Sequence, residues 1–288
     1  MKRRQMLQAA SAAVVGLSAF PLSWVAAAQA KKQRILYFTR SAGFVHSVVN
    51  RNGGPLSHSE KVLTEMGRRA GIEIECSQDG TVFDGDLDRY DAIAFFTSGD
   101  LCIPGGTGKP MTLRGKQNLL AAVAAGKGFV GFHACTDSFH SKGDQIDPYP
   151  AMVGAEFLTH GAQQDASLII ASRFPGLRDL AMAEGISFHE EWYAQKNFAK
   201  DLHVILVQET RHMQGDCYRR PDYPCTWARK QGQGRVFYTS LGHREDIWIN
   251  PFFQAIVMGG FAWILGNVQY DVTPNIDRVT PKANQLHA

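Results

Sequence analysis

Residues 127–140, KGFVGFHACTDSFH, begin as an apolar strand and end in small and polar side chains. A Gly-Lys-Gly sequence at 126–128 stops the preceding helix, and the apolar run follows in Phe129, Val130 and Phe132. Ligands of α/β proteins bind beyond the carboxyl ends of the strands. The segment therefore predicts that His133 and Asp137 stand at the mouth of a binding site. The alternative is a buried histidine followed by an aspartate that caps a helix.

The first half of the chain alternates strand patterns with helix patterns. Apolar stretches at residues 34–39, 72–77 and 91–97 predict strands. Ser57 and Glu60 have the spacing of a capping box, so a helix is expected after them, and Gly71 would end it. A second helix is expected at residues 112–125. This order predicts an α/β fold whose parallel sheet is covered by helices on both faces.

The second half is richer in strands. Strands are expected at residues 167–172 and 203–209, followed by a hairpin of 224–229 and 234–241, while residues 186–193 mix aromatic side chains with two carboxylates. A short helix should open at Pro175, and residues 251–265 form an apolar, buried helix. Residues 269–288 are expected to be a polar, irregular tail. The length of the chain fits one large α/β domain over residues 31–268.

Residues 1–30 have the pattern of an export signal. Lys2, Arg3 and Arg4 precede an Ala-rich apolar stretch that ends in Ala-Gln-Ala. Arg3 and Arg4, followed by Gln-Met-Leu, fit the twin-arginine pattern, and the alternative is an ordinary secretory signal. Glycine, proline and serines interrupt the stretch, which makes it a poor membrane span. We therefore expect a twin-arginine signal peptide and a mature chain in the periplasm.

Charge and cysteine content limit the partners of the mature chain. The three basic residues of the signal account for the formal charge of +3, so the mature chain is neutral. A neutral protein does not suit a nucleic acid or an anionic membrane, and no other run is apolar enough to span a bilayer. The chain has 5 cysteines, an odd number that leaves at least one free thiol. Cys217 and Cys225 lie in a polar loop and could form a disulfide.

Three further segments place polar residues after apolar ones. Residues 156–160 end in His160, residues 240–244 contain His243 and Arg244, and residues 189–193 carry two carboxylates beside aromatic residues. Several histidines at strand ends make a shared site mouth more plausible than one alone. The aromatic residues Trp192 and Trp227 have two interpretations, which are core packing and a wall that stacks on sugar rings.

At these positions the sequence resembles the trehalose-utilisation (ThuA-like) family over about residues 34–266. The resemblance rests on Gly-Phe-Val-His at 43–46, Gly-Phe-His-Ala-Cys-Thr-Asp at 131–137, Phe-Leu-Thr-His at 157–160, Glu-Glu-Trp-Tyr at 190–193, Pro-Cys-Thr-Trp at 224–227 and Leu-Gly-His at 241–243. It implies a flavodoxin-like, class I glutamine-amidotransferase-like three-layer sandwich with a mainly parallel central sheet. It also implies carbohydrate use, including 3-keto sugars made by a partner dehydrogenase. The chain departs from the family in having Glu190 for Asp and Gly161 for Pro.

The fold relationship argues against glutaminase chemistry. In the amidotransferases the turn after the central strand carries a nucleophilic cysteine, whereas His133 holds that place here and Cys135 comes two residues later. A nucleophile needs the position at the elbow and an adjacent base. We therefore expect Cys135 to be a small packed residue.

We expect a sugar-directed lyase, hydrolase or isomerase that uses a divalent metal. Imidazoles and carboxylates bind Zn, Mn, Fe, Co or Ni, and no nucleotide cofactor is expected. The candidate metal ligands are His133, His160 and His243, with one carboxylate. The candidate catalytic residues are Asp137 or Glu191 as the base that removes the C2 proton of a 3-keto glycoside, and His243 as the acid. The candidate substrate-binding residues are His46, Trp192, Tyr193, Trp227 and Arg244.

Two alternatives remain open at this point. The first is a periplasmic protein that binds carbohydrate without turnover, with the histidines of a metal-free pocket bound to sugar hydroxyls. The second is a structural or partner-binding module of an export-linked complex. Metal content measured together with product formation separates the enzyme from the binding protein.

Overall fold

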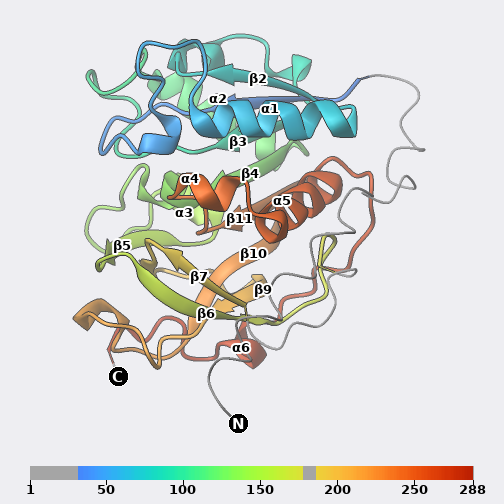
Figure 1. The fold of residues 1–288 in the computed structure, drawn as a ribbon. Helices are drawn as coiled ribbons and strands as arrows, with labels where there is room; N and C mark the ends of the chain where they lie inside the picture. The colour runs from blue at the N-terminus through green and yellow to red at the C-terminus, as the bar shows by residue number, and fades with distance from the viewer. Residues whose placement is uncertain (1–31, 178–185, 288) are drawn as a thin grey trace.

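The computed structural model describes residues 32–177 and 186–287. The predicted signal peptide therefore lies outside the described residues, and so does most of the short helix expected after Pro175. The centre of the fold is a nine-stranded sheet in the order β2-β1-β3-β4-β11-β10-β9-β6-β7. Figure 1 shows this sheet running through the whole molecule, with helices on both of its faces.

One half of the sheet is entirely parallel. It consists of β1 (Arg34–Phe38), β2 (Glu73–Ser77), β3 (Ala92–Phe95), β4 (Gly128–Phe132) and β11 (Gly234–Thr239). Each neighbouring pair in the order β2-β1-β3-β4-β11 is parallel. Strand order 2-1-3-4-5 with parallel strands is that of flavodoxin-like folds. The predicted α/β fold with a mainly parallel sheet is confirmed.

The other half of the sheet is antiparallel. Here β10 (Tyr223–Gln231), β9 (His203–Gln208), β6 (Gln164–Ile170) and β7 (Ile186–Glu190) follow one another, and β10 and β11 form the predicted hairpin. Residues 186–193, which mix aromatic side chains with two carboxylates, contribute to two strands. After Glu190 the chain leaves the large sheet, and β8 (Tyr193–Lys196) pairs with β5 (Glu156–His160) in a separate two-stranded sheet. The break places Glu191 in a turn.

Helices pack on the two faces of the sheet. Buried side chains of α1 (His58–Ala70) and α5 (Pro251–Ile264) belong to one apolar cluster, on the side nearer the viewer in Figure 1. Side chains of α2 (Leu113–Ala124) and α3 (Pro148–Val153) belong to the cluster on the opposite face. Burial on both faces explains why β1, β3 and β4 are apolar in nearly every position, whereas the edge strand β2 alternates polar and apolar residues. Among the described residues, no helix has the length and hydropathy needed to cross a membrane.

Capping residues define the ends of α1, as expected. The Ser57 side chain accepts from the backbone N–H of Glu60, and the Glu60 carboxylate accepts from the backbone N–H of Ser57. Gly71 closes the helix with a φ of 73°, in the left-handed region. Glu60 is fully buried, and it also accepts from Arg51 and Thr39. The capping box therefore ties the helix to the loop that follows β1.

The last residues of the chain are ordered against the sheet. They contain the short α4 (Glu245–Trp248) before α5 and the short α6 (Ile276–Val279) after it. Asn275 bonds both backbone groups of Val204 on β9, and Arg220 donates to the carbonyl of Ala283. The polar tail expected at residues 269–288 is therefore packed onto the antiparallel half. These contacts use the Asn275 side chain and the Ala283 carbonyl, and composition alone does not reveal them.

All five cysteines are free thiols. The disulfide considered for Cys217 and Cys225 is absent, since Cys225 is buried on β10 while Cys217 lies in the loop before it. Cys135 is fully buried, and burial raises the pKa of its thiol well above the ordinary value. Both facts agree with the prediction that Cys135 is a packed residue.

Candidate metal centre

His133 begins the 3₁₀ helix η6 (His133–Asp137), directly after β4. Its φ is 37°, a left-handed conformation that is uncommon for any residue except glycine. The side chain is fully buried, and Nδ1 lies 2.7 Å from the carbonyl oxygen of Ser240. A carbonyl only accepts, so Nδ1 carries the hydrogen and Nε2 carries a lone pair. The strained turn therefore directs the lone pair on Nε2 of His133 into the site.

Glu191 is the centre of the group. Its Oε2 lies 3.0 Å from Nδ1 of His243, 3.3 Å from Nε2 of His133 and 3.9 Å from Nε2 of His46. Its other oxygen, Oε1, lies 3.4 Å from Nδ1 of His160. Because the break between β7 and β8 puts Glu191 in a turn, one carboxylate reaches side chains from four other segments.

Four side chains come close enough to share an ion. The ligand atoms of His46, His133, Glu191 and His243 all lie within 4.8 Å of one another. His46 follows β1, His133 follows β4 and His243 follows β11, so the carboxyl ends of three parallel strands supply the imidazoles. Among the described residues, this is the group of His, Cys, Asp or Glu side chains whose ligand atoms lie close enough together to hold a metal ion. We call these four residues the His3Glu group.

Burial controls the charge of the His3Glu group. It lowers the pKa of His133 to about 3 and lowers the pKa of His46 as well, so both imidazoles are neutral near pH 7. Burial alone would raise the pKa of Glu191, but its contacts with the imidazoles of His133, His243 and His46 outweigh burial and hold that pKa well below its usual range. The group therefore offers neutral imidazoles beside an ionised carboxylate, which is the state that binds metal ions.

Glu190 supports the group from behind. It is fully buried, and its two oxygens accept from the backbone N–H of Glu191 at 2.9 Å and of Gly242 at 3.3 Å. It therefore links the turn that carries Glu191 to the turn that carries His243. Burial raises the pKa of Glu190 to about 8.

The two tryptophans do not form a wall for sugar rings. Trp192 and Trp227 are both 0% exposed, and their indole N–H groups donate to the carbonyls of Gln164 and Val153. The packing interpretation is therefore correct for both, and their assignment to substrate is wrong. Trp227 lies on β10, whereas Trp192 lies in the turn between β7 and β8, and sequence order alone does not reveal that either side chain faces the core.

The remaining candidates lie around the His3Glu group. The imidazole of His160 is 42% exposed and approaches the outer oxygen of Glu191. Asp137 accepts a 2.6 Å hydrogen bond from His140. Tyr193 is nearly buried. Its ring centroid lies 4.1 Å from that of His133, and its hydroxyl lies 3.4 Å from Nε2 of His46. His46 thus occupies the position in the group that was predicted for His160.

The rim contains residues that the sequence did not single out. The ring of Phe44 is 67% exposed and lies edge-to-face with His46, at 4.9 Å between centroids. Gln163 contacts Nε2 of His243 and accepts from Arg244, a predicted substrate ligand that also pairs with Asp246. The Gly-Phe-Val-His motif at 43–46 contained the signal for Phe44, because it places an aromatic residue two positions before a site histidine.

Two solved structures share this architecture. A ThuA-like protein from Bacteroides uniformis is 15% identical, with a TM-score of 0.62 over 82% of this chain and 93% of that one. A ThuA-like protein from Parabacteroides merdae is 15% identical, with a TM-score of 0.55 over 85% of this chain and 95% of that one. At this identity the likeness shows the fold. No protein with a curated description matches the chain.

A sequence model of one family matches most of the chain. The match is to ThuA, described as trehalose utilisation, and covers residues 19–264. It includes every residue of the His3Glu group and Glu190 behind it. The chain belongs to the ThuA family.

Proposed function

We propose that the His3Glu group binds one divalent metal ion. The observation that carries the proposal is the convergence of four ligand atoms within 4.8 Å. Three imidazoles and one carboxylate are an ordinary ligand set for Zn, Mn, Fe, Co or Ni. His133 fits this role because its Nδ1 is hydrogen-bonded to the carbonyl of Ser240, which fixes the tautomer of a ligating imidazole. The imidazole of His160, 42% exposed beside the outer oxygen of Glu191, marks the side from which substrate would approach.

The substrate that fits this chemistry is a glycoside carrying a ketone at C3. The trehalose-utilisation description of the family supports a carbohydrate. A ketone at C3 acidifies the proton on C2, and a bound divalent ion would stabilise the negative charge that develops on the ketone oxygen. The ketone requires a preceding oxidation of the C3 hydroxyl, so a sugar dehydrogenase would act before this protein.

Asp137 is the better of the two candidate bases. Glu191 is held by histidines, whereas the Asp137 side chain is 19% exposed and its carboxylate accepts from His140. In the proposed reaction Asp137 takes the C2 proton, and the C1–O bond breaks with its electron pair going to the departing oxygen. His160 protonates that oxygen, because its imidazole is 42% exposed while that of His243 is 13% exposed. The products are an unsaturated keto sugar and an alcohol, and addition of water completes a net hydrolysis.

The test is elemental analysis combined with turnover. Wild-type protein is expected to contain about one divalent ion per chain and to release the aglycone from a 3-keto glycoside. His133→Ala should lose both the ion and the turnover, because it removes the ligand with the fixed tautomer. His189→Ala is the matched control: His189 is an exposed histidine that pairs with Asp165 on the neighbouring strand, so both properties should remain.

Two results would overturn the proposal. Wild-type protein that is free of metal, active and indifferent to chelators would end the metal centre. Protein that binds sugar but releases no aglycone from any 3-keto glycoside, with metal present, would favour the carbohydrate-binding alternative.

A further inference from the structure

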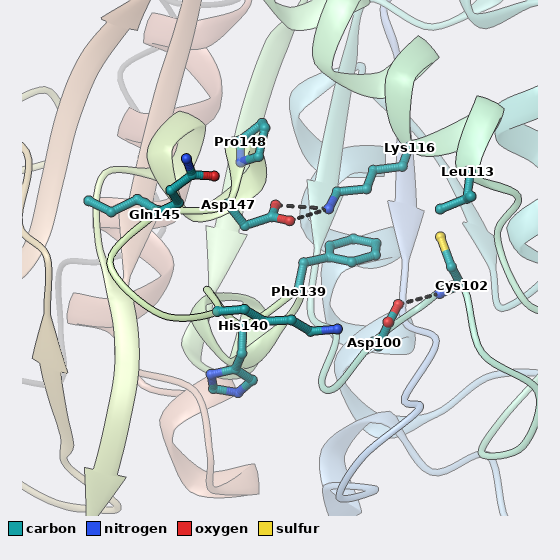
Figure 2. Close-up of a pocket in the computed structure, with 11 residues that line it drawn as sticks. Asp100, Cys102, Leu113, Lys116, Phe139, His140, Gln145, Asp147 and Pro148 are labelled. Atoms are coloured by element: carbon teal, nitrogen blue, oxygen red, sulfur yellow. Dashed lines mark hydrogen bonds and ion pairs between the residues drawn. The ribbon is translucent and has the colours of Figure 1, made fainter.

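A second cavity lies beside the metal centre, on the face of the sheet that α2 and α3 cover. Its volume is about 420 Å³, within the range of small-molecule sites. Figure 2 shows that its walls come from the first turns of α2, from the loop after β3 and from residues 139–148. The polar lining consists of Asp100, Lys116, His140, Lys142, Gln145 and Asp147.

The charges that line the cavity balance one another. Lys116 donates to both oxygens of Asp147, at 2.7 and 2.8 Å, and its ammonium lies 4.1 Å from the centroid of Phe139. Asp100 accepts from the backbone N–H of Cys102. Two carboxylates thus face two ammonium groups, so the lining attracts neither an anion nor a cation strongly.

The lining instead suits a neutral ligand with many hydroxyl groups. Gln145 is exposed and offers both a donor and an acceptor, and the outer oxygens and ammonium groups add more. Leu113 and Ile146 leave apolar surface uncovered at the opening, with 72% and 48% of their area exposed. A sugar ring presents hydroxyls at its edge and C–H groups on its faces, which matches this mixture.

The cavity and the His3Glu group are joined by one short segment. His133 begins that segment, and Phe139 and His140, which line the cavity, end it. Asp137 lies between them and accepts from His140, while the backbone of Gly99 bonds both Asp137 and Phe139. The Asp137–His140 pair therefore lies on the segment that connects the metal centre to the cavity.

We propose that this cavity binds the departing sugar unit of a disaccharide-like glycoside, while the ring that carries the ketone lies at the His3Glu group. The inference rests on the proposed function for the identity of the bond that breaks. It adds that the aglycone is a neutral sugar and that residues 139–148 and α2 recognise it. Asp137, between the two sites, would then lie beside the bond that joins the two rings.

The experiment compares a long and a short substrate. In the double variant Lys142→Ala/Gln145→Ala, the KM for a 3-keto disaccharide should rise at least tenfold, about 1.4 kcal/mol, while the KM for a methyl 3-keto glycoside stays unchanged. Leu113→Trp, which fills the opening, should act in the same direction. Lys61→Ala/Gln117→Ala removes exposed side chains of the same two types away from the cavity and is the control. Metal content should be equal in all of them.

A binding measurement without turnover separates the two proposals. Calorimetry with unmodified trehalose and maltose should detect binding to wild type and a matching loss in the cavity variants. If no glycoside is turned over but this loss appears, the cavity assignment stands and the reaction is wrong. If the cavity variants bind disaccharide like wild type, or change both substrates equally, the cavity assignment is wrong. Tighter binding of inorganic phosphate than of either disaccharide would also overturn it.

Discussion

Glu190 is a buried acid whose ordinary pKa of 4.5 is raised to about 8 by desolvation. Between these two values the folded protein keeps a proton that the unfolded chain has released. Stability must therefore fall as the pH rises through this window, by as much as about 1.4 kcal/mol per pH unit from this group. This fall in stability comes from Glu190, whose hydrogen bonds to the segments that carry the His3Glu group are made to backbone N–H groups.

Glu190→Gln should remove that decline. The amide keeps the shape of the side chain but does not titrate. The free energy of unfolding of the variant minus that of wild type should therefore increase as the pH rises from about 5 to about 8. Urea unfolding of both proteins at several pH values, with a chelator present, measures the difference. Parallel curves for the two proteins would show that Glu190 is ionised in the folded state.

Phe44 is the exposed aromatic ring nearest to a residue of the His3Glu group. The preceding residues are fixed by backbone bonds from Ala42 and Gly43 to Ser98, whose hydroxyl donates to the carbonyl of Phe44. A ring held rigidly at the mouth offers a face for the C–H groups of a sugar.

Phe44→Ala should raise KM for the sugar by roughly three- to tenfold, equivalent to about 0.6–1.4 kcal/mol. Metal content should not change, and Phe44→Trp should restore binding. Ile249→Ala, at an apolar side chain that is 62% exposed, is the control. Steady-state kinetics with metal analysis decides the matter, and an unchanged KM in Phe44→Ala would remove the ring from the substrate site.

At this scale the sequence predicted the side chains of the centre better than those around it. His133 and His243 follow strands of the parallel half, whose carboxyl ends meet at one edge, so their convergence was predictable. Glu191 follows the antiparallel strand β7, and that argument does not place it. The choice of His46 over His160 was not, because it depends on the path of a loop. The burial of Trp192 and Trp227 depends on which segments pack against the turn after β7 and against β10, which local sequence does not record.

Among the elements, β4 and η6 pack closely against each other at Gly131. A Cβ atom on Gly131 would lie 2.2 Å from Sγ of Cys135 and 3.0 Å from the ring of Tyr238. The glycine therefore lets the turn that carries His133 fold back tightly onto its own strand.

Gly131→Ala should destabilise the protein by about 1–3 kcal/mol through overpacking. Cys135→Ala removes the closest atom, so the double variant should recover part of the loss, and unfolding of all four proteins gives the coupling.

Cys135→Ser alone should keep turnover within about tenfold, because the buried thiol is not a nucleophile. A loss of several orders of magnitude in the folded serine variant would contradict this.

Element boundaries were predictable where local chemistry sets them. The capping box at Ser57 and the left-handed Gly71 define α1 through backbone bonds that neighbouring residues supply. The separation of β7 from β8 was not predictable, because it is set by two partner strands, β6 and β5, that lie elsewhere in the sequence.

For the whole molecule, we propose that the precursor uses the twin-arginine pathway, which carries chains that have already folded. Changing Arg3 and Arg4 to lysine should leave the precursor in the cytoplasm, because that pathway requires the arginine pair. Cell fractionation with an antibody to the mature chain measures the distribution. Normal delivery of the double variant to the periplasm would indicate an ordinary secretory signal.

The position of β11 determines when the chain can become compact. It lies between β4 and β10, and its Tyr238 bonds the carbonyl of His133, 105 residues earlier. Until β11 leaves the ribosome, β4 is an open strand edge on which other chains can pair. Contacts of such sequence separation also form slowly, since a long loop must close before they are made. The two halves of the sheet, and with them the site between β1, β4 and β11, therefore assemble only after synthesis of the chain is nearly complete.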